Sequence, residues 1–358
     1  MADVTLAVGN EAIAEAAIRA GCRYFFGYPI TPQNELPEYM SKRLPEVGGV
    51  FVQAESEVAA INMVFGASAA GGRVMTSSSS PGVSLKQEGI SYMVGAELPC
   101  VIVNMMRAGP GLGGIQPAQS DYYQATRGGG HGDYRCLVYA PASVQEMVDL
   151  TGLSFQKADE YRNPVIILGD GMLGQMMEPV QFPEMVQGPF PEKPWATTGR
   201  KGGPQRVVTS INLQPDELYQ HNLKLQAKYD DMKNRETRSE VWGPRDAEIY
   251  VVAYGTMARI CQAAVGRARE EGIPCGLVRP ITLWPFPDKI LEGLPCARAF
   301  LAVEMSMGQM VDDVRLAVCG KAPVHFFGRA GGVVPKPGEI LEEIRKVARS
   351  LEGGGLDG

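Results

Sequence analysis

Short apolar runs alternate with helix-like stretches along the first half of the chain. Most of these runs are uniformly apolar, which is typical of strands buried on both faces of a parallel sheet. The predicted strands are residues 23–26, 49–52, 73–76, 99–104, 136–139 and 164–168. Helical periodicity marks residues 11–20, 55–70 and 143–160 between them. Repeated strand–helix units of this kind predict an open α/β sandwich.

The pattern changes after Glu178. Pro and Gly are frequent up to about residue 204, which indicates an extended linker, and the charged segment 216–240 predicts a solvated helix. The alternation then resumes, with strands at 248–253, 275–278, 299–303 and 324–326 and helices at 257–271 and 307–318. We therefore expect two open α/β domains, residues 1–190 and 246–358, joined by residues 191–245 as a linker with a charged helix.

The composition excludes several classes of protein. With 40 acidic against 34 basic residues, the net charge of −6 argues against a nucleic-acid partner. No apolar run approaches the ~18 residues of a membrane helix, and the N-terminus does not have the pattern of a signal peptide. Seven scattered cysteines without a C-x-x-C pair predict a cytoplasmic protein that holds no iron–sulfur cluster by itself.

Three segments that could carry chemistry each follow a predicted strand, at the edge of a parallel sheet where ligands bind. In the first, Pro29 and Pro32 flank Ile30 and Thr31. Two prolines make a stiff turn that can present the Thr31 hydroxyl and backbone groups to a ligand. The alternative is that Pro32 opens the next helix, with Thr31 as its N-cap.

The second segment carries Glu55 and Glu57 ahead of a run of small residues. Small residues allow a helix to pack tightly, and a glutamate in the first turn is favoured by the helix dipole. That explanation needs no function. The alternative is that one carboxylate faces inward and performs acid–base chemistry.

The third segment is a Gly-rich loop that begins at Arg107, directly after a buried strand. A guanidinium can bind a small carboxylate in a bidentate fork, although an Arg on the surface beside a flexible loop fits as well. No Gly-Lys-Ser/Thr follows, and the Rossmann fingerprint is absent, so the loop does not indicate a nucleotide-phosphate site.

Two further features stay open. The serine run that ends at Ser80 could line a ligand with hydroxyls or form a loop with a helix cap. His131 lies in a glycine loop that could close over a substrate, but an exposed loop histidine is an equal alternative. Gly169, Asp170 and Gly171 follow a strand as a magnesium–diphosphate motif would, but residues 172–211 contain no Asn to complete it. We interpret these three residues as a tight turn.

Taken in order, four segments resemble the alpha-type subunit of the 2-oxoacid:ferredoxin oxidoreductases: residues 28–32, 55–60, 107–110 and 130–133. Residues 278–287 and 303–310 resemble the second domain of that subunit, so the resemblance covers nearly the whole chain. The loop 107–115 lacks the Ser-Thr-Gly version typical of 2-oxoglutarate enzymes. It is more similar to the branched-chain members, which act on 2-oxoisovalerate.

The resemblance implies a thiamine-diphosphate-binding fold, the pyrimidine domain, followed by a transketolase C-terminal-like domain. It implies thiamine diphosphate shared with a beta-type partner subunit that supplies the diphosphate and Mg²⁺ site. [4Fe-4S] clusters are expected in gamma- and ferredoxin-type partner subunits, within a dimer of hetero-oligomers. The implied reaction is the CoA-dependent oxidative decarboxylation of a 2-oxoacid to acyl-CoA and CO₂, with electrons passed to ferredoxin.

The resemblance also implies roles for six residues. Glu57 is expected to hydrogen-bond a ring nitrogen of the aminopyrimidine, and it is chosen over Glu55 because it directly precedes the Ala-rich helix, as the family's glutamate does. Thr31 and Arg107 are expected to hold the substrate carboxylate. Pro29, Ile30 and Ser80 are expected to contact the cofactor, and no residue of this chain is expected to bind a metal.

Other functions remain open at this point. The same enzyme class could act on pyruvate or 2-oxoglutarate. A subunit of a lipoamide-linked 2-oxoacid dehydrogenase and a non-catalytic scaffold of the same fold are the further alternatives.

Overall fold

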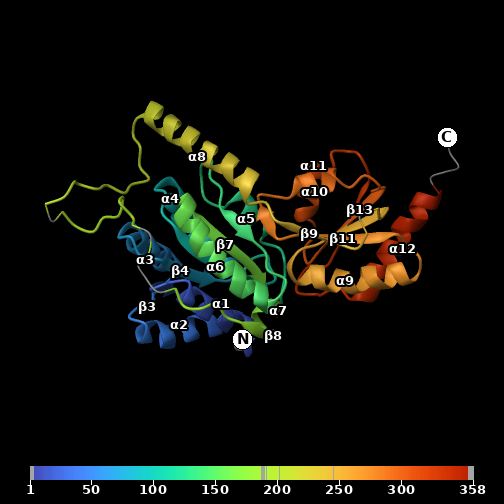
Figure 1. The fold of residues 1–358 in the computed structure, drawn as a ribbon, viewed down its shortest axis with the longest axis horizontal. Helices are drawn as coiled ribbons and strands as arrows, with labels where there is room; N and C mark the ends of the chain where they lie inside the picture. Colours follow the sequence, from blue (N-terminus) through green and yellow to red (C-terminus); the bar gives the residue numbers. More distant parts are fainter. Residues whose placement is uncertain (1–3, 187–189, 191, 201, 245, 354–358) are drawn as a thin grey trace.

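The computed structural model describes residues 4–186, 190, 192–200, 202–244 and 246–353. Two sheets lie side by side along the long axis of the molecule, with the first half of the chain around one and most of the second half around the other (Figure 1). The first sheet has seven strands. In spatial order they are β12 (Thr282–Trp284), β6 (Leu137–Tyr139), β7 (Pro164–Asp170), β5 (Cys100–Met106), β4 (Val74–Ser78), β2 (Tyr24–Gly27) and β3 (Val50–Gln53).

The six strands predicted for the first half all lie in this sheet, and they pair in parallel. β4, β5 and β7 are buried along their whole length, as uniformly apolar runs predict, whereas β3 lies at the edge and is partly exposed.

Helices cover both faces of this sheet. Phe25 packs with α1 (Gly9–Arg19), α2 (Glu35–Glu46) and α6 (Val144–Tyr161). Phe26 points the other way, toward α3 (Glu57–Ala69), α4 (Ser80–Gly95), α5 (Tyr122–Arg127) and α8 (Pro215–Arg235).

The second sheet has five strands, and the four strands predicted for this part of the chain belong to it. Their spatial order is β14 (Val324–Gly328), β13 (Ala299–Glu304), β10 (Ile249–Val252), β11 (Cys275–Pro280) and β9 (Ser239–Trp242). One face packs against α9 (Gly255–Glu270) and α12 (Pro337–Gly353), and the other lies toward α10 (Asp288–Glu292) and α11 (Met310–Val318).

The charged segment after the linker differs from the predicted solvated helix. α8 ends at Arg235, and residues 239–242 form β9, which pairs antiparallel with β11. α8 buries Leu225, Tyr229 and Met232 against the first half of the chain. The three positions follow helical spacing and form a narrow apolar stripe, which the many charges around it conceal in the sequence.

Short strands join segments that are far apart in the sequence. β12 belongs to the second half of the chain but pairs antiparallel with β6 at the edge of the first sheet. β1 (Val4–Val8) pairs with β8 (Met177–Gln181) as a separate two-stranded sheet. Neither pairing was predicted. The domain boundaries at residues 190 and 245 stay a prediction, and β12, from beyond the second boundary, belongs to the first sheet.

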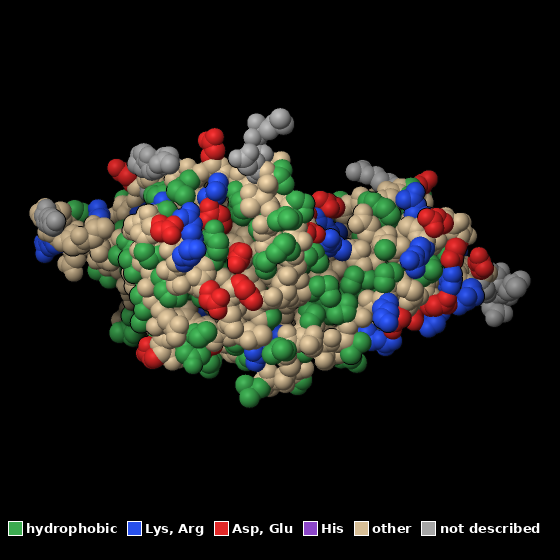
Figure 2. Space-filling view, turned by 90° about the horizontal axis from the view of Figure 1, so that it is seen from below, with side chains coloured by type: hydrophobic (Ala, Val, Ile, Leu, Met, Phe, Trp, Pro, Cys, Tyr) green, Lys and Arg blue, Asp and Glu red, His purple; other side chains and the backbone are tan. Residues whose placement is uncertain are grey.

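The surface of the described residues carries charges of both signs. Acidic and basic side chains intermingle on the face shown in Figure 2, most densely toward the C-terminal end. Among the described residues, no helix is both long and apolar enough to cross a membrane. All seven cysteines are free thiols, and only Cys296 and Cys319 are exposed.

Candidate active site

Glu57 begins α3 and lies on its buried side. The hydroxyl of Ser56 accepts the Ala59 N–H at 3.1 Å, which caps the helix one residue before Glu57. Only 6% of Glu57 is exposed, whereas Glu55 lies outside the helix and is exposed. Within the described part of the chain, no group donates a hydrogen bond to the Glu57 carboxylate. A buried carboxylate without a donor is available to a ligand.

The serine run after β4 lies against this carboxylate. A Cβ placed on Gly82, in the first turn of α4, would come within 2.6 Å of Glu57 Oε1 and 2.1 Å of Ser78 Oγ. The hydroxyls of Ser78 and Ser79 are buried, and no described group hydrogen-bonds them. The structure therefore places the unpaired Glu57 carboxylate and the unpaired Ser78 hydroxyl on either side of Gly82, and the unpaired Ser79 hydroxyl follows Ser78 in the sequence.

Lys86 lies one turn further along α4 and is completely buried. Its Nζ donates to Thr76 Oγ1 at 2.6 Å and to the Ser77 carbonyl at 3.0 Å. Burial lowers the pKa of this lysine to about 7, and the charge of Glu57 opposes that shift. A lysine among apolar and small neighbours was the one signal of this residue in the sequence.

The side chain of Arg107 reaches the proline turn. Its Nη1 donates to the Thr31 carbonyl and its Nη2 to the Leu112 carbonyl, both at 3.0 Å. The Nε is buried, and no described group accepts from it. Thr31 is not a helix cap, because α2 begins at Glu35 with Asn34 in the N-cap position. The structure thus brings Thr31 and Arg107 together, through the Thr31 carbonyl rather than the hydroxyl.

Ser80 connects α4 to the backbone of Arg107. Its hydroxyl donates to Asp121 Oδ2 at 2.6 Å and accepts the Arg107 N–H at 3.0 Å. Asn104 donates to the same carboxylate oxygen at 2.9 Å and accepts the Ser80 N–H at 3.1 Å. Burial raises the pKa of Asp121, and the hydrogen bonds from Ser80 and Asn104 oppose that shift. Sequence reasoning assigned Asp121 no role, although a polar Asn104 within a buried strand was a signal of such a network.

Pro29 and Ile30 lie in the same turn as Thr31, between β2 and α2. Pro29 is exposed and Ile30 is partly exposed. Both therefore present apolar surface next to Thr31, the residue to which Arg107 donates a hydrogen bond. Further apolar side chains are exposed on the elements around the site. They are Tyr28, Val58, Leu85, Leu112 and Ile115. A surface of this kind is typical of a region that a ligand or partner covers.

Two other candidates lie outside this arrangement. Asp170 is the N-cap of α7 (Gly171–Gln175), where its Oδ1 accepts the N–H groups of Met172 at 3.0 Å and Leu173 at 3.2 Å. The predicted tight turn is therefore a strand-to-helix turn. No group of three or more His, Cys, Asp or Glu in the described ranges could hold a metal. His131 is exposed, and its carbonyl accepts from Ser91 in the third turn of α4, away from the first turn that holds Ser80.

Comparisons with known proteins match most of the chain to one enzyme family. Residues 15–240 match the family described as pyruvate flavodoxin/ferredoxin oxidoreductase, thiamine diP-bdg. Residues 247–340 match pyruvate:ferredoxin oxidoreductase core domain II. The ketoisovalerate oxidoreductase subunit VorB of Methanothermobacter thermautotrophicus is 54% identical over 95% of this chain and 97% of its own. The 2-oxoglutarate synthase subunit KorA of the same organism is 38% identical over 95% and 98%.

Solved structures show the same fold. The 2-oxoglutarate:ferredoxin oxidoreductase from Magnetococcus marinus, with 2-oxoglutarate, coenzyme A and succinyl-CoA bound, aligns with a TM-score of 0.86 at 27% identity. The alignment covers 97% of this chain and 66% of that one. A split-gene transketolase aligns with a TM-score of 0.56 at 14% identity, over 96% and 98% of the two chains, which is a likeness of fold alone. The chain belongs to the 2-oxoacid:ferredoxin oxidoreductase family, and its sequence is similar to the ketoisovalerate members.

Proposed function

We propose that this chain is the pyrimidine-binding subunit of an enzyme that converts 2-oxoisovalerate and CoA to acyl-CoA and CO₂ and reduces ferredoxin. One observation carries the proposal. The first turn of α4 contacts the Glu57 carboxylate through Gly82 and the Arg107 backbone through Ser80. A single rigid turn therefore fixes an acid–base group and a carboxylate-binding group relative to each other, as catalysis on a small carboxylate requires.

The polar groups around Gly82 suit the pyrimidine end of thiamine diphosphate. The buried hydroxyls of Ser78 and Ser79 and the carboxylate of Glu57 offer unpaired polar atoms to a nitrogen-containing ring. When bound, the cofactor supplies the electron sink that decarboxylation of a 2-oxoacid needs. Glu57 would hydrogen-bond a ring nitrogen and hold a proton at its carboxylate. Pro29 and Ile30 would form an apolar wall, and Ser80 would border the cofactor from α4.

Arg107 and Thr31 would hold the substrate carboxylate. Each Nη of Arg107 uses one N–H on a backbone carbonyl, of Thr31 or Leu112, which fixes the plane of the guanidinium. The remaining N–H groups can bind a carboxylate in a fork. The exposed side chains of Leu112 and Ile115, in the same loop, can contact an apolar tail.

We infer that the site is completed by other subunits. Val58 and Leu85 are exposed on α3 and α4 beside Glu57, which suits a partner that covers these helices. A beta-type subunit would bring the diphosphate and Mg²⁺ site, since Asp170 is occupied in capping α7. Gamma- and ferredoxin-type subunits would hold [4Fe-4S] clusters, in a cytoplasmic dimer of hetero-oligomers. No nucleic acid and no membrane take part.

2-Oxoglutarate is the second candidate substrate, because the 38% identical relative is named a 2-oxoglutarate synthase subunit. The test is the purified, co-expressed complex with CoA and each oxoacid, with reduction of ferredoxin or a viologen dye as the readout. We expect reduction without any lipoyl protein, fastest with 2-oxoisovalerate. Acyl transfer that depends on a lipoyl protein would instead identify a lipoamide-linked dehydrogenase, and a complex inactive on every oxoacid would identify a scaffold.

A further inference from the structure

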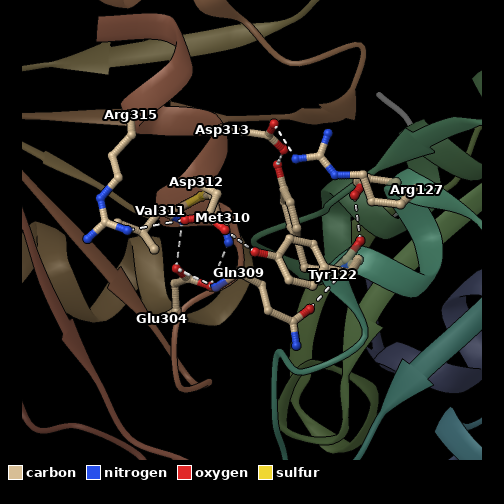
Figure 3. Close-up of polar contacts among 11 residues, drawn as sticks. Tyr122, Arg127, Glu304, Gln309, Met310, Val311, Asp312, Asp313 and Arg315 are labelled. Atoms are coloured by element: carbon tan, nitrogen blue, oxygen red, sulfur yellow. Dashed lines mark hydrogen bonds and ion pairs between the residues drawn. The ribbon is translucent and has the colours of Figure 1, made fainter. Parts of the chain in front are cut away.

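The loop that begins at Arg107 is fastened at its far end to the second half of the chain. Gln309, which precedes α11, donates from Nε2 to the Ser120 carbonyl at 2.8 Å and accepts the Tyr123 N–H at its Oε1 at 2.8 Å. One carboxamide thus holds the backbone on both sides of Asp121. The Tyr122 hydroxyl adds a hydrogen bond of 2.6 Å to Asp313 on α11 (Figure 3).

Gln309 is itself held firmly. The carboxylate of Glu304 is completely buried and accepts the backbone N–H groups of Gln309 at 3.1 Å, Met310 at 2.9 Å and Val311 at 2.9 Å (Figure 3). Three charge-assisted hydrogen bonds from one helix start fix the direction in which the Gln309 side chain leaves the backbone. The second half of the chain therefore presents a rigid carboxamide to residues 120–123.

Asp121 is linked to the backbone of Arg107 through the hydroxyl of Ser80. Its carboxylate is the strongest acceptor within reach of the Ser80 hydroxyl, so the proton of that hydroxyl points to Asp121. The oxygen of Ser80 then turns a lone pair to the Arg107 N–H. If the proton pointed instead to the Arg107 carbonyl, which lies 3.2 Å away, this arrangement would be lost.

We propose that Asp121 is a positioning residue for the substrate arginine, and that the second half of the chain acts on it through Gln309. Asp121 does not touch the substrate in this scheme. It sets where the backbone of Arg107 lies and hence where the guanidinium points. The proposal rests on the proposed function, since it assumes that Arg107 binds the carboxylate of a 2-oxoacid.

A double-mutant cycle on the assembled complex tests this coupling. Asp121→Asn keeps the shape of the side chain but gives the Ser80 proton a weaker acceptor. We expect it to raise KM for 2-oxoisovalerate roughly tenfold or more while KM for CoA stays within about twofold. In an Arg107→Met background the same substitution should change KM for the oxoacid by less than about twofold, because the group it positions is gone.

Gln309→Met is the second variant, and it should raise KM for the oxoacid in the same direction because it frees the backbone at residues 120 and 123. Asp216→Asn, at an exposed position in the first turn of α8, is the matched control and should leave both KM values unchanged. Equal effects of Asp121→Asn in the two backgrounds, or an equal rise in KM for CoA, would overturn the coupling while the proposed function stands. A wild-type complex inactive on every 2-oxoacid would overturn the proposed function, and this inference with it.

Discussion

Gly82 lies directly against the carboxylate of Glu57. A Cβ on Gly82 would come within 2.6 Å of Glu57 Oε1, far inside van der Waals contact. The same Cβ would come within 2.1 Å of Ser78 Oγ, so no side chain fits here unless Glu57, Ser78 or the first turn of α4 moves. The space between the Glu57 carboxylate and the helix start that carries Ser80 is therefore too small for even one added methyl group.

Gly82→Ala should consequently impair cofactor activation without unfolding the chain. We expect a cost of about 1–3 kcal/mol from overpacking and a loss of roughly tenfold or more in thiazolium proton exchange by the complex. Gly152→Ala is the control, because Gly152 lies within α6 and a Cβ placed on it would meet open space. Unchanged proton exchange in Gly82→Ala would show that Glu57 does not need its present position.

Glu57→Gln should leave assembly of the complex nearly intact and slow thiazolium proton exchange by the ~10²–10⁴-fold typical of lost acid–base catalysis. Glu55→Gln is a matched control two residues away, and it should have far less effect because Glu55 is exposed outside α3. Proton exchange measured by NMR on both variants decides the assignment. If Glu55→Gln were the more damaging change, Glu57 would not be the acid–base residue.

The isolated chain should bind thiamine diphosphate poorly. Its residues offer the pyrimidine end a carboxylate and two hydroxyls, but Asp170 caps α7 and none of the described clusters suits a metal. Titration calorimetry with and without Mg²⁺ is the measurement. Tight, Mg²⁺-dependent binding by this chain alone would contradict a site divided between subunits.

The substrate preference should follow the loop after Arg107. Its exposed side chains include Leu112 and Ile115, and each methylene that a substrate buries contributes roughly 0.8 kcal/mol. 2-Oxoisovalerate should therefore exceed pyruvate in kcat/KM by about tenfold or more. The second carboxylate of 2-oxoglutarate would face apolar groups, at a cost of several kcal/mol unless a partner supplies a cation.

Arg107→Met should lower kcat/KM for all three oxoacids alike, since they share the carboxylate that Arg107 would bind. The comparison of the three oxoacids on the wild-type complex and on this variant completes the experiment. A preference for 2-oxoglutarate would exclude the branched-chain assignment and leave the enzyme class standing.

Glu97 follows the end of α4 and forms ion pairs with Lys224 and Lys228 on α8. The packing of α8 against the first half of the chain should therefore be sensitive to acid. Burial by itself would raise the pKa of Glu97, but hydrogen bonds from Lys224 and Lys228 outweigh it and lower the pKa from 4.5 to about 2. Because the folded-state pKa is depressed, this contribution to stability is complete above pH 4.5 and is lost as the pH falls toward 2.

Glu97→Gln should accordingly lower the unfolding temperature at pH 7, and the difference from wild type should shrink below pH 4.5. Glu88→Gln, on the exposed side of α4, the helix that ends just before Glu97, should show little difference at either pH. A difference for Glu97→Gln that is the same at pH 7 and pH 3.5 would show that the ion pairs contribute nothing.

The sequence predicted the parts of this fold that depend on local pattern. Uniform apolar runs identified the central strands, and the motifs that follow them meet where parallel strands end. The proximity of Thr31 to Arg107 could be expected for that reason, although their contact through a backbone carbonyl could not. A side-chain pattern carries no information about which backbone group accepts a hydrogen bond.

What the sequence could not predict depends on contacts between distant segments. Asp121 becomes significant only because Ser80 and Asn104 lie beside it, and neither is near it in sequence. The strand β12 has three residues, too few for any alternation to be recognised. α8 was expected in solvent because its three buried residues are outnumbered by charges.

Because β12 pairs with β6, expressing the two halves of the chain as separate pieces would remove one strand from the first sheet. A fragment that stopped before residue 246 would leave β6 as an open edge and would remove Trp284 from its edge-to-face contact with Tyr229 on α8. Exposed strand edges invite pairing with other chains. The three residues of β12 thus protect this edge. The half of the polypeptide that is synthesised later supplies the strand that keeps the sheet of the earlier half from pairing with other chains.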